Sequence, residues 1–214
     1  METTIAGPDG KPRCRWCGST PEMMHYHDTE WGYPVSDDRR LFEKLCLEGF
    51  QTGLSWRTIL DKREHLREAF HHFDFEKVAS YTGQDIDRLL NNKGIIRHRG
   101  KIEAVINNAK RAQELVRREG SLAAFLWRYE PAAGLAKPQT VSVSEASTAL
   151  SKDLKKLGWK FVGPTTMHAF MQSMGLINDH VEDCAVRPPV EAARATFIRP
   201  GISAGFIELK KGHP

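Results

Sequence analysis

Apolar side chains recur at helical spacing along most of the chain. The clearest series spans residues 102–116 and closes at Gly120, which predicts a long amphipathic helix. Apolar positions also follow Asp37 and Asp38 at helical spacing, and Ser55 suits the start of the next helix. Further helices are expected at about 83–91, from Ser121 to Pro131, around 150–157, and from Pro164 to about Gly175. The pattern therefore predicts an all-α fold.

Two stretches lack this periodicity. Residues 131–146 are rich in Pro, Gly, Ser and Thr, which is typical of a linker or crossover loop. Residues 187–214 begin with Arg187-Pro188-Pro189 and show no sustained period, so they are expected to form a flexible C-terminal tail. The ordered part of the chain is therefore expected to end near residue 186.

Net charge says little about the partner of this protein. The chain has 214 residues, 40% of them apolar, enough for one domain or two small helical lobes. Residues 187–214 hold five of the basic and two of the acidic residues, so they contribute +3 of the net +4. A local cluster of eight basic residues at 93–118 is compatible with a solvated helix face. Charge alone therefore does not indicate DNA binding.

The four cysteines point towards metal binding. The sequence contains no run of 18 apolar residues, and its N-terminus lacks the hydrophobic stretch of a signal peptide. A cytoplasmic protein without membrane contact is therefore expected. Cysteines stay reduced in that compartment, where they bind metals more often than they form disulfides.

Residues 154–166 have the pattern of a helix–hairpin–helix. The first helix would end at Gly158, a short hairpin would contain Gly163, and a new helix would begin at Pro164. Glycine permits close backbone approach, and the free N–H groups of a helix start attract phosphate. The lysines that would assist are Lys155, Lys156 and Lys160. An ordinary helical hairpin with capping glycines explains the same pattern, so both interpretations stay open at this point.

Cysteine and histidine residues near both ends of the chain could share a metal. His180 and Cys184 are four positions apart, which places them on one helical face, while Cys14 and His27 lie near the N-terminus. Two cysteines and two histidines make a closed tetrahedral zinc site with a structural role. A rival quartet lies entirely in the N-terminal segment: Cys14, Cys17, His25 and His27. Spacing does not choose between the two.

Aromatic and acidic residues concentrate in segments 26–32 and 47–56. Trp31 and Trp56 could be ordinary core residues, but Gly49 and Gly53 surround a polar break between two helices. A carboxylate beside aromatic rings is what a cationic purine would need, because the rings offer stacking and cation–π attraction.

These features together resemble the bacterial 3-methyladenine DNA glycosylase I family. The resemblance covers about Cys14 to Cys184. It rests on Tyr26-His27-Asp28, Glu30-Trp31-Gly32, Cys46-Leu47-Glu48-Gly49, Gly53-Leu54-Ser55-Trp56, the segment 94–102, Lys160-Phe161-Val162-Gly163 and Asn178-Asp179-His180. It implies an all-α helix–hairpin–helix glycosylase domain of two helical lobes over residues 12–186, with the tail at 187–214.

The resemblance also implies roles for particular residues. Zinc would join the N- and C-terminal parts through Cys14, His27, His180 and Cys184, which excludes Cys17 and His25. The base pocket would consist of Tyr26, Trp31 and Trp56 with Glu48 as the catalytic residue. Two positions depart from the family pattern: Cys17 replaces an apolar residue and Met23 an aromatic one, so ligand exchange and a different pocket packing are open.

The expected reaction is hydrolytic release of 3-methyladenine from double-stranded DNA by a monomeric enzyme. A flipped-out cationic base is already a good leaving group, and Leu54 beside Gly53 would enter the gap in the stack. Lys160, Gly163 and Thr165 would contact DNA. Glycosylases of the wider superfamily that also cut the strand carry a lysine just after the hairpin, where Thr165 stands here, so a monofunctional enzyme is expected.

Three questions stay open on the sequence. Asp179 could be a base for the attacking water, although capping beside His180 is the simpler interpretation. A non-catalytic DNA-binding module held together by zinc is the main rival to an enzyme. A catalytic zinc hydrolase is a second rival, against which four protein ligands argue.

Overall fold

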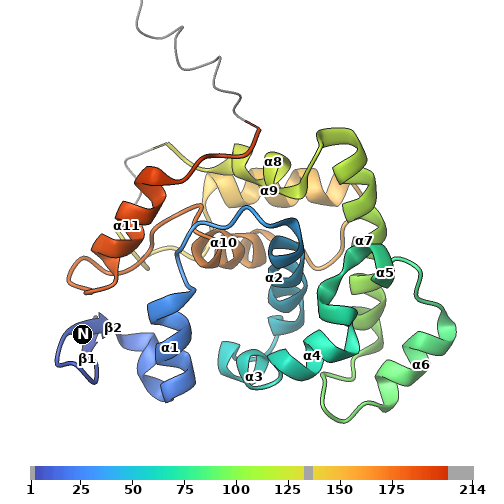
Figure 1. Cartoon of the computed structure of the whole chain (residues 1–214), viewed down its shortest axis with the longest axis horizontal. Coiled ribbons are helices and arrows are strands. Elements are labelled where there is room, and N and C mark those ends of the chain that lie inside the picture. Colours follow the sequence, from blue (N-terminus) through green and yellow to red (C-terminus); the bar gives the residue numbers. More distant parts are fainter. Residues whose placement is uncertain (1–2, 133–136, 202–214) are drawn as a thin grey trace, which may run out of the picture.

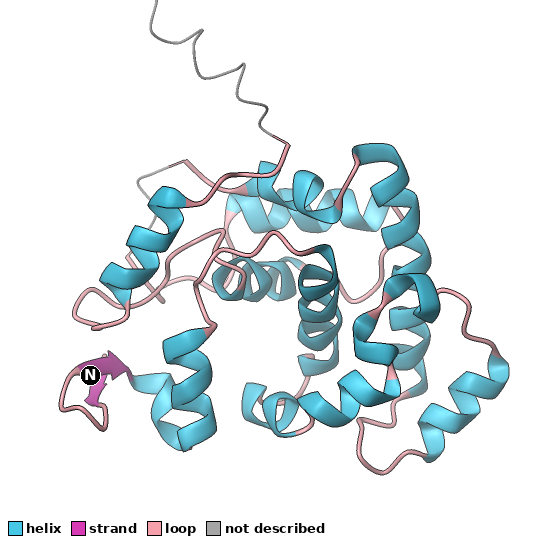
Figure 2. Cartoon of the chain, viewed as in Figure 1, coloured by secondary structure: helices cyan, strands magenta, loops and turns pink. Residues whose placement is uncertain are grey.

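Two helices, α2 (Asp38–Gln51) and α10 (Pro164–Ser173), lie at the centre of the molecule (Figure 1). The computed structural model describes residues 3–132 and 137–201. The other elements are β1 (Thr4–Ala6), β2 (Pro12–Cys14), η1 (Arg15–Ser19), α1 (Pro21–Thr29), α3 (Trp56–Asp61), α4 (Arg63–Ala69), η2 (His71–Phe73), α5 (Phe75–Val78), α6 (Gly83–Asn91), α7 (Arg99–Glu119), α8 (Leu122–Leu126), η3 (Trp127–Tyr129), α9 (Glu145–Lys156) and α11 (Arg187–Thr196). Helices dominate the chain (Figure 2), which confirms the predicted fold class. No helix in the described ranges is both long enough and apolar enough to traverse a bilayer.

Local capping explains most helix boundaries. The Asp37 side chain accepts from the backbone N–H of Arg40 and so begins α2, and Ser55 caps α3 in the same way. Gly120 ends α7 with φ of 86°, a conformation that a residue with a Cβ rarely adopts. These starts and stops match the helices that the periodicity predicted.

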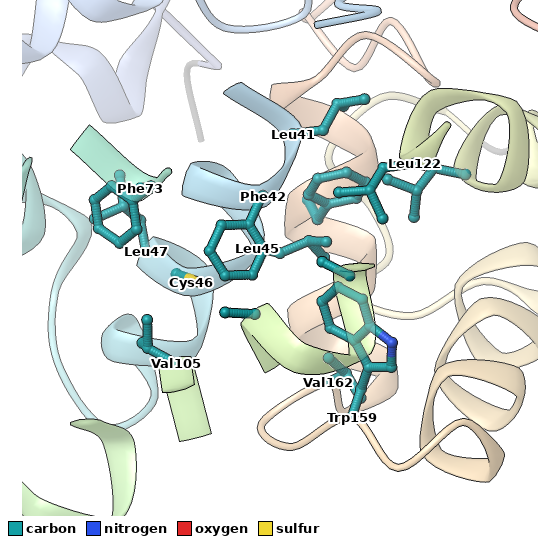
Figure 3. Packing of buried hydrophobic residues seen from close by; sticks show 14 of the residues in the cluster. Leu41, Phe42, Leu45, Cys46, Leu47, Phe73, Val105, Leu122, Trp159 and Val162 are labelled. Carbon is teal, nitrogen blue, oxygen red and sulfur yellow. The ribbon is translucent and has the colours of Figure 1, made fainter. Parts of the chain in front are cut away.

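The hydrophobic core forms around α2. Leu41, Phe42 and Leu45 of this helix face Trp159 and other residues from the hairpin and α8 (Figure 3). Phe42 has no exposed surface. Burial of one such ring stabilises the fold by about 1.5–3 kcal/mol. Because α2 is buried along nearly its whole length, polar residues on it lie inside the protein as well.

A short β-hairpin precedes the helices, which the prediction of helices throughout did not include. β1 and β2 pair antiparallel, with Thr4 opposite Cys14. Pro8 and Asp9 are the central residues of the turn, which the Gly10 N–H closes on the Gly7 carbonyl at 3.0 Å, and Gly10 has φ of 73°. The Asp-Gly pair is a hairpin signal in the sequence, but three-residue strands are too short for a visible alternation. The hairpin brings Cys14 to the side of the molecule where α11 lies (Figure 1).

The prediction of a flexible tail from residue 187 is wrong for its first ten residues, which form α11. Pro188 and Pro189 lie in the first helical turn, where no backbone donor is needed, so they favour a helix start there. Val190 is fully buried, and Arg194 pairs with Glu130 at 2.9 Å. Residues 202–214 of the predicted tail lie outside the described residues.

Candidate active site and metal centre

Cys14, His27, His180 and Cys184 form one buried cluster. Their ligand atoms all lie within 4.8 Å of one another. The Cys184 sulfur is 3.6 Å from both His27 Nε2 and His180 Nδ1, and these two nitrogens are 3.1 Å apart. Tetrahedral zinc with its usual bond lengths separates such atoms by about 3.3–3.8 Å. The cluster therefore fits zinc, and its four protein ligands leave no open position.

Neighbouring groups fix the two imidazoles for metal binding. Asp28 accepts from His27 Nδ1 at 2.7 Å, which leaves Nε2 for the metal. His180 Nε2 donates to the backbone carbonyl of Trp31 at 3.0 Å, which leaves Nδ1. Arg13 in turn holds both carboxylate oxygens of Asp28 at 2.9 Å.

The rival N-terminal quartet does not come together. His25 is exposed, on the opposite side of α1 from the buried His27. Cys17 is fully buried near His27 but does not belong to the group of four. The structure therefore groups the ligands from the two ends of the chain, as the resemblance implied.

An open pocket of about 430 Å³ lies beside this cluster. Tyr26, Trp31, Glu48 and Trp56 all line it, so the structure brings the four predicted base-pocket residues together. The rings of Tyr26 and Trp56 are 5.2 Å apart, and Trp31 packs against His180 at 4.7 Å. Trp31 therefore forms a wall between the pocket and the metal cluster.

Sequence reasoning missed several residues of the pocket. Trp16 packs on Trp31 at 5.0 Å, and Met23 occupies the position where an aromatic residue was expected. The predicted linker also contributes: Gln139, Val141 and Ser142 line the pocket. The remaining lining residues are Gln51, Thr165, His168, Ala169 and Gln172. Of these residues, Trp16 could have been predicted from the sequence, because it lies two residues from the predicted metal ligand Cys14.

Lys44 is the most consequential residue that was missed. It is buried one turn before Glu48 on α2, and its Nζ lies 3.1 Å from Glu48 Oε1. It also donates to the Tyr26 hydroxyl at 2.6 Å. Burial lowers the pKa of Lys44 to about 8, although Glu48 acts in the opposite direction. Burial likewise raises the pKa of Glu48 above its usual value, against the opposing effect of Lys44.

Asp179 does not line the pocket. One carboxylate oxygen accepts from the backbone N–H of Gln139 at 3.0 Å, and the other accepts from Gln172 at 2.6 Å. Gln139 also donates to the Cys14 sulfur at 3.2 Å. Asp179 thus ties the loop that borders the pocket to α10, and each of its oxygens accepts one of these hydrogen bonds.

The hairpin and the turn after α2 flank the pocket. Leu54 is 41% exposed at that turn, beside Gly53, which has φ of 79°. Lys160 is exposed on the hairpin, and Gly163 precedes α10 with no side-chain cap, so the first N–H groups of α10 are free for a ligand. Thr165 is exposed and also borders the pocket.

The hairpin touches α2 at a glycine. Phe161 has φ of 56°, and a Cβ added at Gly49 would lie 3.3 Å from the Phe161 Cβ. A side chain at position 49 would therefore press on the Phe161 side chain, while the Phe161 carbonyl oxygen lies at an ordinary contact distance of 3.8 Å. Close packing here depends on the residue next to Glu48 having no side chain.

Comparisons with known proteins agree with this architecture. A family profile described as methyladenine glycosylase matches residues 16–187. The chain belongs to the methyladenine glycosylase family. It is 49% identical over 177 residues to DNA-3-methyladenine glycosylase of Haemophilus influenzae, covering 80% of this chain and 96% of that protein. It is 46% identical over 185 residues to DNA-3-methyladenine glycosylase 1 of Escherichia coli, covering 82% of this chain and 97% of that one.

Solved structures of the family have the same fold. A crystal structure of 3-methyladenine DNA glycosylase I matches with a TM-score of 0.77 and 46% identity, covering 81% of this chain and 98% of that chain. A variant of 3-methyladenine DNA glycosylase I in complex with 3-methyladenine matches with a TM-score of 0.76 and 40% identity, covering 82% and 97%. The predicted helix–hairpin–helix glycosylase fold is thereby confirmed.

Proposed function

We propose that this protein removes 3-methyladenine from DNA in base excision repair. The observation that carries the proposal is the convergence of Glu48, Tyr26, Trp31 and Trp56 on one open pocket in a chain of this family. The names of its relatives and a relative's complex with 3-methyladenine support the same substrate. An open aromatic pocket with a buried carboxylate in its lining also argues against a DNA-binding module without catalytic activity.

Recognition of the base follows from the groups that face the pocket. The methylated base carries a positive charge in DNA that normal adenine lacks, so aromatic faces and the Glu48 carboxylate favour it. Tyr26 accepts from Lys44, so its own hydroxyl hydrogen is free to point towards a base. Trp31 and Trp56 offset part of the cost of unstacking, which is a few kcal/mol.

DNA would be held at the rim of this pocket. The free N–H groups after Gly163 and the Lys160 ammonium bind backbone phosphate, while Leu54 enters the space left by the flipped base. The residues that line the pocket in the described ranges include no lysine, so strand cleavage through a Schiff base has no nucleophile there. The enzyme is therefore monofunctional, and water attacks the sugar carbon that carried the base.

Zinc in the four-ligand cluster would have a structural role. When bound, it supplies a cross-link between β2, α1 and the segment before α11. Cys14, His27, His180 and Cys184 would hold it, and they leave no position for a reacting water.

The decisive test is incubation of the protein with methylated duplex DNA, followed by chromatography of the released purines. We expect 3-methyladenine in the released fraction, together with alkali-labile abasic sites and no strand breaks before alkali. Unmethylated DNA is the control. Abasic sites at background with no released 3-methyladenine would refute the proposal, and breaks before alkali would refute its monofunctional part.

A further inference from the structure

The exposed turn that carries Leu54 is held by a lysine from another helix. The turn follows α2 and consists of Thr52, Gly53 and Leu54, all of them exposed. The Lys101 ammonium of α7 donates to the Thr52 carbonyl at 2.6 Å and to the Phe50 carbonyl at 2.8 Å. Lys101 therefore ties both the last turn of α2 and the start of the exposed turn to α7.

The charge of Lys101 suits the end of a helix. The last carbonyls of a helix have no partner within it and carry partial negative charge, which a cation complements. α2 has no basic residue in its own last turn. Lys101 is only 8% exposed, and burial lowers its pKa with no acidic partner among the described residues to oppose that effect. The end of α2, rather than an ion pair, is thus what the buried ammonium binds.

The same face of α7 also holds the hairpin. Asn108 lies seven residues after Lys101, which places the two side chains on one side of the helix. The Asn108 amide donates to the Lys160 carbonyl at 2.9 Å, and its oxygen accepts from the Lys160 N–H at 2.9 Å. Lys101, Asn108 and Lys160 border a cavity of only about 10 Å³, so the Lys101 side chain has little room to move. One helix thus fixes both the turn with Leu54 and the hairpin.

We propose that Lys101 is a positioning residue for the insertion of Leu54 into DNA. The inference rests on the proposed function, in which Leu54 enters the space left by the flipped base. An inserted side chain has to keep its place between stacked bases. Gly53 gives the turn conformational freedom, and the ammonium restricts that freedom at the preceding carbonyl. Without it, binding to DNA would also have to order the turn, and affinity would fall.

The test measures how strongly the protein prefers a duplex with a gap in its base stack. A tetrahydrofuran residue mimics an abasic site and leaves the space that Leu54 would fill. The measured quantity is the ratio of the affinities for this duplex and for an undamaged one. We expect Lys101→Met to lower the ratio by about tenfold, as for one lost hydrogen bond to a charged group. Leu54→Ala should lower it as well, and the double variant should be no weaker than Leu54→Ala alone, because both changes act on one step.

A matched control and a second readout separate positioning from general damage. Lys110→Met removes the same charge from an exposed position of α7 and should keep the wild-type ratio. Affinity for free 3-methyladenine should be unchanged in Lys101→Met, because neither Lys101 nor the turn at 52–54 lines the base pocket. If Lys101→Met does not fold, the same measurements are made on Lys101→Gln, which also removes the charge but keeps a polar side chain.

Four results would overturn the inference. They are a wild-type ratio in the folded variant, an equal loss of affinity for the free base, additive losses in the double variant, and failure of both Lys101 variants to fold, which would give Lys101 a role in general stability. None of these affects the proposed function. That function fails instead if the wild-type protein shows no preference for the tetrahydrofuran duplex and releases no 3-methyladenine from methylated DNA.

Discussion

The metal cluster and the base pocket share helix α1 but are built on opposite principles. His27 points into a buried cluster in which four side chains can satisfy one ion, while the preceding residue, Tyr26, lines an open pocket. The cluster is closed, and its second-layer bonds are complete. The pocket retains unused groups: Trp56 Nε1, for example, has no hydrogen-bond partner in the described part of the chain. The polar groups of the cluster are thus paired within the protein, whereas the pocket keeps a buried donor that is not.

The largest expected effect comes from removing one ligand of the buried metal cluster. Cys184→Ser should lose zinc and lower the free energy of unfolding by about 5 kcal/mol or more, because metal binding by such sites is largely folding energy. Metal analysis and thermal unfolding with and without a chelator measure both. Cys17→Ser, which alters a buried cysteine outside the cluster, should keep one zinc per chain. Zinc loss in Cys17→Ser instead would favour the N-terminal quartet.

In the pocket, Glu48→Gln should reduce release of 3-methyladenine by about 10- to 100-fold, since a hydrogen bond to a charged group contributes about 1.5–3 kcal/mol. The thermal midpoint should fall as well, because the buried Lys44 ammonium loses its charged partner, so rates are compared at a temperature where both proteins are folded. Single-turnover release from methylated DNA gives the rate.

The wild-type rate should also depend on Glu48 ionisation. Burial raises the pKa of Glu48, so activity should fall on the acid side at a higher pH than an ordinary glutamate would give. That acid limb should be absent in Glu48→Gln. A variant with wild-type rates at all pH values would remove Glu48 from the mechanism.

A substitution with a smaller effect should again distinguish the metal cluster from the base pocket. Val190→Ala would leave a cavity where α11 packs beside the cluster, and we expect a loss of about 2 kcal/mol in unfolding free energy. Base release by the folded protein should stay at the wild-type rate. Ile198→Ala, at an 86% exposed position, is the control and should be neutral. Slower release in Val190→Ala would mean that the two regions are energetically coupled.

The smallest effect is expected at the DNA edge of the pocket. Lys160→Gln should weaken DNA binding modestly and lower the slope of log affinity against log salt by about 1, as for one phosphate contact. Free 3-methyladenine should bind as in the wild type. Titrations at several salt concentrations give the slope, and an unchanged slope would place the phosphates elsewhere.

The sequence predicted those parts of the structure in which a residue type has one usual structural role. Helix boundaries followed from caps such as Asp37 and Ser55, whose side chains bond to their own helix starts. The four residues of the buried Cys2His2 cluster and the four predicted pocket residues followed from family motifs, because spacing alone left two quartets open. Helix periodicity also could not show that Tyr26 and His27 face different sites.

The misses have physical reasons as well. A lysine four residues before a glutamate is usually a solvated pair, and nothing local shows that α2 is buried on the side of Lys44. Loop residues such as Gln139 gain their positions from distant partners, here Asp179 and Cys14. α11 has prolines and few apolar residues, so its docking depends on tertiary contacts of Val190 and Arg194.

The contact between Gly49 and Phe161 fixes the position of the hairpin relative to the pocket. In the proposed function the hairpin holds the DNA strand, and Glu48, next to Gly49 in the sequence, contacts the base. A methyl group at residue 49 would lie 3.3 Å from the Phe161 Cβ, so the hairpin would have to shift slightly to accommodate it. The absence of a Cβ at Gly49 would therefore influence how deeply a flipped-out base can enter the pocket.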